Sequence, residues 1–214
     1  MQYKTILLTF FTLIATWLFS QPLHASQTFV IASFGDSLSA GYRLPPEGAF
    51  PVQLQKTLRA KGLDVEVLNA AVSGDTTTGA LARLDWSIGE NVQAVIIELG
   101  ANDALRGVNP TITRDALNKI LTRFQERGIK VLLAGMLAPP NLGPDFGNSF
   151  NAIYPDLAQK YDVLLYPFFL ENVAADPSLN LSDGIHPTME GIGIIVDSIL
   201  PSVEALLDSI EPAS

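Results

Sequence analysis

Short apolar segments of strand length alternate with helical segments along most of the chain, and this alternation constrains the fold more than any other feature. Residues 92–99 (VQAVIIEL) are mostly apolar, as in a strand buried on both faces. Residues 110–127 follow Asn109, a helix-capping residue, and place apolar side chains at helical spacing. The alternation predicts an α/β fold, with a parallel sheet covered by helices on both faces. The expected strands are 28–34, 65–69, 92–99, 130–133 and 163–166, and the expected helices are 50–60, 78–86, 110–127, 150–161 and a last helix after Pro187.

The first 25 residues have a different pattern from the rest. Lys4 precedes an apolar run over residues 6–19, and Pro22 and Ala25 follow that run. A short positive region, an apolar core and a small residue at a break are typical of a secretory signal peptide. A transmembrane anchor is the alternative, but the run is shorter than the roughly 20 residues that a spanning helix needs. We therefore expect a signal peptide over 1–25, one domain over 26–214, and a periplasmic or secreted protein without a stable membrane anchor.

Charge and cysteine content exclude several classes of function. The net charge is −9, and no run of Lys or Arg is present, which disfavours nucleic acid and anionic lipid as partners. The absence of cysteine excludes disulfides, thiolate metal sites and cysteine nucleophiles. Of the two histidines, His24 falls within the expected signal peptide, so His186 is the only histidine of the expected domain. A single domain without an additional apolar face is expected to be a monomer.

Candidate catalytic residues follow the expected strands. Ser37 comes after the first strand, and Asp183 and His186 lie together near the end of the chain. The carboxyl ends of parallel strands meet at one edge of a sheet, so these residues can converge there. A serine hydroxyl needs a base to become a nucleophile, and an imidazole is a neutral base near neutral pH. An aspartate three residues from the histidine can hold its Nδ1–H and leave Nε2 facing the serine.

Two further loops offer hydrogen-bond donors for a developing oxyanion. Gly74 follows the second strand and Asn102 the third, so the N–H groups of Ser37 and Gly74 and the amide of Asn102 can supply three donors. Each residue alone has an ordinary interpretation as a helix cap, a turn or a structural histidine, but their occurrence in matching loops favours a catalytic site. We expect structural roles, as acceptors of backbone N–H bonds, for the aspartates that flank these loops: Asp36, Asp75 and Asp103.

Four motifs carry a resemblance to a known family. GDSL (35–38), the glycine of SGDTTTG (73–79), GAND (100–103) and DGIHP (183–187) resemble the four signature blocks of the SGNH (GDSL) hydrolases. The chain is most similar to the bacterial periplasmic acyl-CoA thioesterase, lysophospholipase and arylesterase group, as seen in LGANDALRG (99–107). AIYPDLAQKYDVLLYPFF (152–169) also resembles that group. Ala101 departs from the second glycine of many members, and Thr188 from an asparagine frequent in this group.

The resemblance implies both fold and chemistry. It implies a three-layer α/β/α sandwich with a flavodoxin-like parallel sheet. It also implies Ser37 as nucleophile, His186 as base and Asp183 as the acid that orients it. The expected oxyanion hole consists of Ser37, Gly74 and Asn102. We expect an enzyme that hydrolyses acyl and aryl esters and acyl thioesters through an acyl-enzyme, with lysophospholipids among its substrates and without a metal or organic cofactor.

The expected substrate rim comprises two segments. Residues 136–146 (MLAPPNLGPDF) are apolar and rich in proline, which suits an acyl chain, although they can also be read as a plain connecting loop. Residues 75–79 are interpreted as a flap that adapts to acyl length. The residues expected to contact the small-molecule substrate are Asp75, Thr76, Thr77, Gly79, Pro139 and Asn141.

Three alternatives are open. A carbohydrate acetyl esterase would use the same chemistry. A non-catalytic flavodoxin-like protein that binds a nucleotide or flavin is suggested by SGDTTTG (73–79), which resembles a phosphate-binding loop. However, Asp75 places negative charge where a phosphate would sit, and the loop follows the second strand rather than the first. A metal-dependent phosphodiesterase is disfavoured by the single histidine and the lack of a clustered carboxylate pair.

Overall fold

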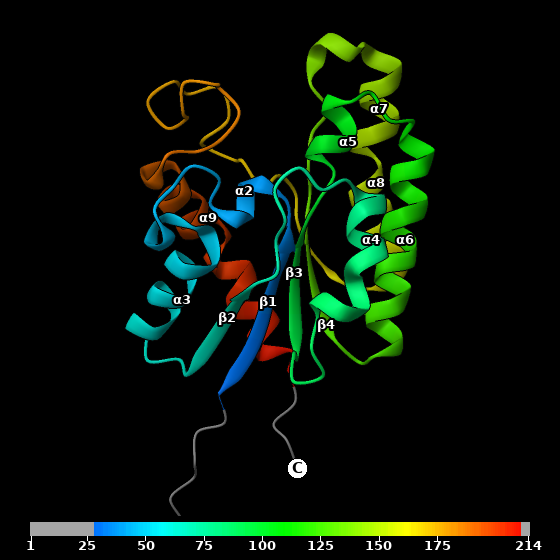
Figure 1. The fold of residues 1–214 in the computed structure, drawn as a ribbon. Coiled ribbons are helices and arrows are strands. Elements are labelled where there is room, and N and C mark those ends of the chain that lie inside the picture. The colour runs from blue at the N-terminus through cyan, green and yellow to red at the C-terminus, as the bar shows by residue number, and fades with distance from the viewer. Residues whose placement is uncertain (1–27, 211–214) are drawn as a thin grey trace, which may run out of the picture.

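A computed structural model describes residues 28–210, which form a parallel five-stranded sheet between two layers of helices (Figure 1). The strand order is β2-β1-β3-β4-β5, and every neighbouring pair is parallel. This confirms the predicted α/β sandwich and its flavodoxin-like sheet. The predicted signal peptide lies outside the described residues. The strands are β1 (Phe29–Gly35), β2 (Val65–Asn69), β3 (Ala94–Glu98), β4 (Lys130–Ala134) and β5 (Leu164–Tyr166).

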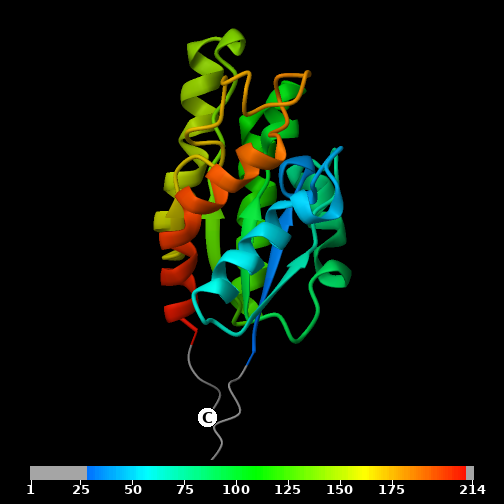
Figure 2. The same ribbon diagram turned by 90° about the vertical axis from the view of Figure 1, so that its left-hand side faces the viewer.

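Helices α3 and α9 cover one face of the sheet, and α4, α6 and α8 cover the other (Figures 1 and 2). The short helices α2 and α5 lie at the carboxyl ends of the strands (Figure 1). Among the described helices, none is long and apolar enough to span a bilayer. The helices are α2 (Ser37–Ala40), α3 (Phe50–Ala60), α4 (Thr77–Ser87), α5 (Ala101–Leu105), α6 (Pro110–Glu126), α7 (Pro144–Asn151), α8 (Ile153–Tyr161) and α9 (Met189–Asp208), with 3-10 turns η1 (Pro46–Gly48) and η2 (Pro140–Leu142).

The burial of the strands explains their sequences. All five residues of the central strand β3 are buried, and Glu98 is the only charged side chain among them. In β2, at the edge of the sheet, Val65 and Val67 are buried while Glu66 is exposed, so its apolar residues alternate. Helix α6 follows the predicted pattern, with Asn109 capping it and its apolar stripe buried, except that Ile112 in the first turn is exposed. Glu98, a charged residue in a fully buried strand, is therefore an exception to the apolar pattern of β3.

The segment before β5 differs from the prediction. Residues 136–146 were expected to form a rim without helix, and 150–161 a single helix. The chain instead forms η2, α7 and α8, and one helix ends and the next begins around Ala152. Pro140 and Pro144 each occupy an early helical position, where the fixed φ of proline and its missing N–H favour a helix start.

Candidate active site

Ser37 lies directly beyond the carboxyl end of β1, as the first residue of α2. Asp36 caps this short helix, because its Oδ1 accepts the N–H of Leu38 at 3.0 Å. Gly41 ends the helix in the left-handed conformation, with φ of 84°. The chain thus turns sharply on both sides of Ser37, and α2, which begins with Ser37, lies at the carboxyl ends of the strands (Figure 1).

A turn before α9 brings His186 and Asp183 to the same edge. His186 Nε2 lies 2.9 Å from Ser37 Oγ, and His186 Nδ1 lies 3.0 Å from Asp183 Oδ2. The turn is closed by the N–H of Leu181, which donates to the carbonyl of His186 at 2.7 Å. The structure therefore brings together the three residues that the sequence analysis placed in one site, in the order serine, imidazole, carboxylate.

The negative charge of Asp183 is stabilised mainly by the backbone of its own turn. Its Oδ1 accepts the N–H groups of Ile185 at 3.0 Å and of His186 at 3.1 Å. These two bonds, and the bond to the His186 ring, lower the pKa of Asp183 to about 2. Asp183 is therefore a carboxylate at any pH at which an imidazole can act as a base.

Tyr42 is a contact that the sequence analysis missed. Its ring lies over the imidazole of His186, with centroids 4.4 Å apart and planes inclined by 38°. Tyr42 follows Ser37 by five residues, so the turn at Gly41 returns the chain toward the site. The GDSL motif marks Ser37 but ends before Tyr42, which is why the motif alone could not identify this residue.

The candidate oxyanion donors come from three loops. Gly74 has a φ of 86°, a conformation that favours glycine. Within residues 28–210, neither the N–H of Ser37 nor that of Gly74 donates a hydrogen bond. Asn102 lies in α5 and donates one Nδ2–H to Asp36 Oδ2 at 2.9 Å, which leaves its second Nδ2 hydrogen for another acceptor. Three donors are thus available on the loops around Ser37.

Two arginines that the motifs did not single out connect these loops. Arg83, almost fully buried, donates to the carbonyls of Gly35 and Ala70, and its Nε is paired with Asp75. Arg106 Nη2 donates to the carbonyl of Gly74 at 2.9 Å. The backbone before Ser37 and the backbone around Gly74 are therefore held by side chains from α4 and from the residue after α5.

The three flanking aspartates have structural contacts, though not all of the expected kind. Asp36 and Asp103 accept backbone N–H bonds, and Asp103 receives that of Thr77 at 2.9 Å, as predicted. Asp75 instead pairs with Arg83. Its position beside the buried guanidinium explains the difference, because a charge-assisted bond to arginine is stronger than one to a neutral N–H.

The expected substrate contacts lie in several environments. Thr77 is fully buried and bonds to Asp103 through both its N–H and its hydroxyl, so it cannot line a substrate rim. Thr76 caps α4 by accepting the N–H of Gly79, and a Cβ at Gly79 would lie 2.7 Å from Asp75 Oδ1. Residues 76–79 thus form a capped helix start rather than a separate flap. Pro139 and Asn141 are at least partly exposed, at η2.

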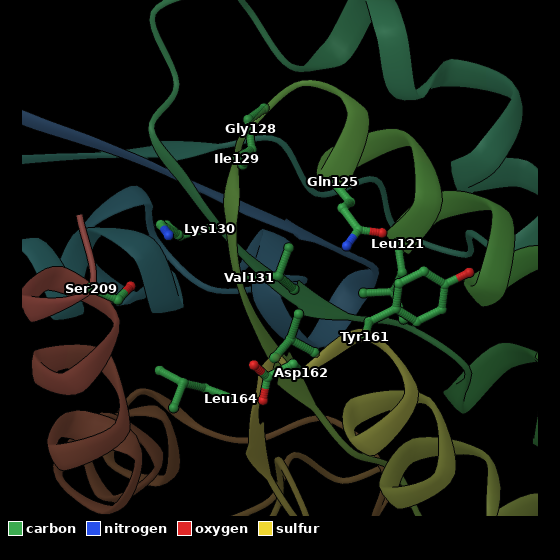
Figure 3. Close-up of a pocket in the computed structure, with 11 residues that line it drawn as sticks. Leu121, Gln125, Gly128, Ile129, Lys130, Val131, Tyr161, Asp162, Leu164 and Ser209 are labelled. Carbon is green, nitrogen blue, oxygen red and sulfur yellow. The ribbon is translucent and has the colours of Figure 1, made fainter. Parts of the chain in front are cut away.

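A cavity of about 430 Å³ lies away from this site (Figure 3). Lys130 and Leu164, at the amino ends of β4 and β5, line it together with Tyr161 and Ser209. Ligands of open parallel sheets bind at the carboxyl ends of the strands. The cavity is at the opposite end of the sheet and is lined by none of the candidate catalytic, oxyanion or substrate residues, so it does not change the choice of candidate site.

Comparison with known proteins decides the family. The model of the GDSL-like Lipase/Acylhydrolase family matches residues 33–192, which include all four motifs. The chain belongs to this family. Among curated relatives of this hydrolase, an arylesterase of Vibrio mimicus is 39% identical over 84% of the chain and 89% of the relative. "Thioesterase 1/protease 1/lysophospholipase L1" of Escherichia coli (strain K12) is 38% identical over 86% of each.

The three-dimensional comparison agrees with the sequence comparison. The crystal structure of AlinE4, described as an SGNH-hydrolase family esterase, matches this GDSL-family hydrolase with a TM-score of 0.71 and 44% identity. The match covers 87% of this chain and 98% of AlinE4. The predicted resemblance to SGNH (GDSL) hydrolases is confirmed at the level of both sequence and fold.

Proposed function

We propose that the protein is a serine hydrolase that cleaves acyl and aryl esters and acyl thioesters, lysophospholipids included, through Ser37, His186 and Asp183. The observation that carries this proposal is the continuous hydrogen-bonded series from Ser37 Oγ to His186 Nε2 and from His186 Nδ1 to Asp183. This is the arrangement that activates a serine toward a carbonyl carbon. Membership of the GDSL-like family, whose relatives include an arylesterase and a thioesterase, supports the same chemistry.

In the first half of the proposed reaction, Ser37 Oγ bonds to the substrate carbonyl carbon while His186 Nε2 removes the hydroxyl proton. The carbonyl oxygen becomes an anion, and it is stabilised by the N–H groups of Ser37 and Gly74 and the amide of Asn102. The bond to the leaving oxygen or sulfur then breaks, and the leaving group receives the proton from His186. The product of this half is an acyl ester of Ser37.

In the second half, water replaces the leaving group. His186 removes a proton from the water molecule as its oxygen attacks the acyl carbon, and returns that proton to Ser37 Oγ as the acyl–serine bond breaks. The carboxylic acid product departs, and the starting state of the enzyme is restored. Asp183 holds the imidazole through Nδ1 and stabilises the imidazolium in both halves.

We propose that the substrate is a small acyl ester or thioester. Apolar side chains are exposed near the carboxyl ends of the strands, which supports contact with an acyl chain. Pro139 and Asn141 border this edge and are retained as proposed substrate contacts, whereas Asp75, Thr76 and Gly79 support the loop that carries Gly74. These exposed apolar side chains are Val72, Leu137 and Ile185 in loops, Leu105 at the end of α5 and Met189 at the start of α9.

Export and assembly form part of the proposal. The pattern of residues 1–25 supports a signal peptide and export to the periplasm or the medium, with a single hydrolase domain over 26–214. A monomer is proposed, because the site draws all its proposed groups from one chain. Size-exclusion chromatography of the purified protein tests the oligomeric state, and mass spectrometry of the exported protein tests the cleavage site.

The decisive experiment measures hydrolysis of p-nitrophenyl esters with short to long acyl chains by the wild-type protein and by Ser37→Ala. We expect Ser37→Ala to lose about a thousandfold or more in kcat. Ser149→Ala, at an exposed serine of α7, is the matched control and should retain wild-type rates. Equal inactivity of all three proteins on every ester and thioester would contradict the proposal, and activity confined to acetyl esters would favour a carbohydrate acetyl esterase.

A further inference from the structure

Two carboxyl groups lie fully buried beneath the proposed nucleophile, and the reaction described above does not use them directly. Asp36 precedes Ser37, and Glu98 ends the central strand β3. The N–H of Asp36 donates to Glu98 Oε2 at 3.3 Å, and Ser39 Oγ donates to the same oxygen at 2.9 Å. A Cβ at Gly35 would lie 2.7 Å from this oxygen, so the chain needs glycine there to fit over the Glu98 carboxyl.

The surroundings of the pair do not supply a countercharge. Among the ion pairs within residues 28–210, none involves Asp36 or Glu98. Arg83, the nearby buried cation, donates to the carbonyl of Gly35 and is paired with Asp75. Glu98 Oε1 has no hydrogen-bond partner within the same range. Two ionised carboxylates here would be buried without a cation, which is strongly unfavourable, so the pair should retain one proton.

The donors around each carboxyl indicate which one carries the proton. Asp36 is an acceptor on both oxygens, from the N–H of Leu38 and from Nδ2 of Asn102. Glu98 accepts on one oxygen only. Burial raises the pKa of Asp36 to about 6, and burial together with the negative charge of Asp36 raises the pKa of Glu98 well above its ordinary value. At neutral pH, Asp36 is therefore the anion and Glu98 the neutral acid.

Other titratable groups near the pair do not alter this assignment. His186 interacts favourably with the negative charge of Asp36, and the buried hydroxyl of Tyr154, from α8, donates to the carbonyl of Leu99. Burial, followed by the negative charge of Asp103, raises the pKa of Tyr154 well above its ordinary value, so this phenol stays neutral beside the pair. A protonated His186, as formed during the reaction, would favour the ionised form of Asp36 further.

We propose that Glu98 is a positioning residue that holds the single proton of a buried carboxyl pair, and thereby keeps Asp36 as a charged acceptor that orients the amide of Asn102. A carboxylate can face only the NH₂ end of that amide, because the amide oxygen is itself an acceptor. One Nδ2–H is fixed on Asp36, and the second then has a defined direction for the substrate oxyanion. This inference rests on the proposed function, since it concerns the oxyanion hole of that reaction.

The kinetic test compares variants that keep or remove the neutral partner. Glu98→Ala removes the group and should lower kcat by about tenfold or more with a smaller change in KM. Glu98→Gln retains a neutral donor and acceptor of the same shape, and it should restore kcat to within about threefold of wild type. If Glu98→Gln is as slow as Glu98→Ala, the charge of Glu98 rather than its proton matters, and the proposal is wrong.

A double-mutant cycle tests the path from Asp36 to Asn102. Asp36→Asn should lower kcat by about a hundredfold, comparable with the loss of one oxyanion donor. If Asp36 acts through Asn102, then Asp36→Asn added to Asn102→Ala should cause less than about a threefold further loss. Multiplicative losses would overturn the proposed path. Glu126→Gln, an exposed substitution on α6, is the control for both kinetic series.

Infrared spectroscopy tests the proton directly and does not depend on activity. At about pH 8 the wild-type protein should show the carbonyl stretch of a protonated carboxylic acid, because ordinary carboxyl groups are ionised there. Glu98→Gln should lack this band, and Glu126→Gln should keep it. A missing band in the wild type refutes the inference even if esters are hydrolysed. A band in a protein that hydrolyses no ester would mean that the proposed function has failed while the protonated pair exists.

Discussion

Two aspartates adjoin the proposed catalytic residues, Asp36 before Ser37 and Asp183 before His186, and their environments are opposite. Asp36 is fully buried between β1 and α2, whereas Asp183 stands on an exposed turn before α9. Burial raises the pKa of Asp36 to about 6, and backbone N–H bonds lower that of Asp183 to about 2. Two aspartates that adjoin residues of the same candidate site thus have pKa values separated by several units.

The difference shows two ways of keeping a carboxylate charged. On the turn, two N–H groups donate to one oxygen of Asp183 and the His186 ring contacts the other, so hydrogen bonds stabilise the charge. In the buried site, the charge of Asp36 is tolerated because its neighbour Glu98 is protonated. The charge of Asp183 is stabilised within the four residues 183–186. The charge of Asp36 instead depends on contacts between the residue after β1, strand β3 and helix α5. Variants at the two sites should therefore fail differently.

The largest expected effect comes from Asp183→Asn, which removes the carboxylate of the exposed aspartate. The amide can present N–H to the imidazole and favour the wrong tautomer, so kcat should fall by about 10³- to 10⁴-fold while KM changes little. Steady-state kinetics on a p-nitrophenyl ester measure the effect. Asp162→Asn is the matched control, because Asp162 is an exposed left-handed residue where asparagine is also well tolerated. A loss below about tenfold would show that Asp183 is dispensable.

The pH dependence of kcat/KM should separate the two aspartates next. Asp183, with its pKa lowered to about 2, stays ionised throughout mild acid and cannot cause a loss there. Protonation of Asp36 below about pH 6 neutralises the acceptor that orients Asn102, so kcat/KM should fall by about a hundredfold between about pH 7 and pH 4. Rates measured in buffers of constant ionic strength test this. A flat profile down to about pH 4 would contradict the role of Asp36 as a charged acceptor.

The two sites also show which parts of the fold and of the candidate site can be predicted from the sequence. The alternation of strands and helices predicted the parallel sheet, because burial on both faces leaves a clear apolar pattern in β3, whereas the strand order was implied by the resemblance to a known family. Ser37, Asp183 and His186 could be placed together because parallel strands end at one edge. Such reasoning needs only local patterns and topology.

Other parts of the site depend on side chains that meet across the fold, and local patterns do not reveal them. Glu98 lies within an apolar strand, and its contact with Ser39 spans 59 positions in the chain. Arg83 appears in sequence as one charged residue of a helix, although it is buried and joins the end of β1 to the loop between β2 and α4. Thr77 was expected at the substrate rim as part of a flap over residues 75–79, but it is buried, and Asp103 accepts both its N–H and its hydroxyl.

Asp103 is a third aspartate near the site, and its environment can be compared with those of Asp36 and Asp183. It is fully buried like Asp36, but it accepts three bonds, from the N–H and hydroxyl of Thr77 and from the hydroxyl of Thr113. Asp103→Asn would place an NH₂ group against some of these donors, so the free energy of unfolding should fall by about 2 kcal/mol. Urea denaturation measures it, with the exposed Asp145→Asn as control. An unchanged midpoint would mean that these bonds contribute little to stability.

The last expected effect is a pH dependence of stability, and it tests the buried aspartate Asp36 directly. The pKa of Asp36 is raised from an ordinary 3.8 to about 6 in the folded state, so between these values the folded protein binds more protons than the unfolded chain. The contribution of Asp36 to the free energy of unfolding is therefore fully present below about pH 4 and is lost as pH rises through about 6. Asp36→Asn has no such proton, and the variant should gain stability relative to wild type across this interval. Urea midpoints of both proteins at several pH values give the difference, which should be level above about pH 7. Parallel curves for the two proteins would mean that Asp36 titrates normally, and the contrast with Asp183 would then arise from the exposed turn alone.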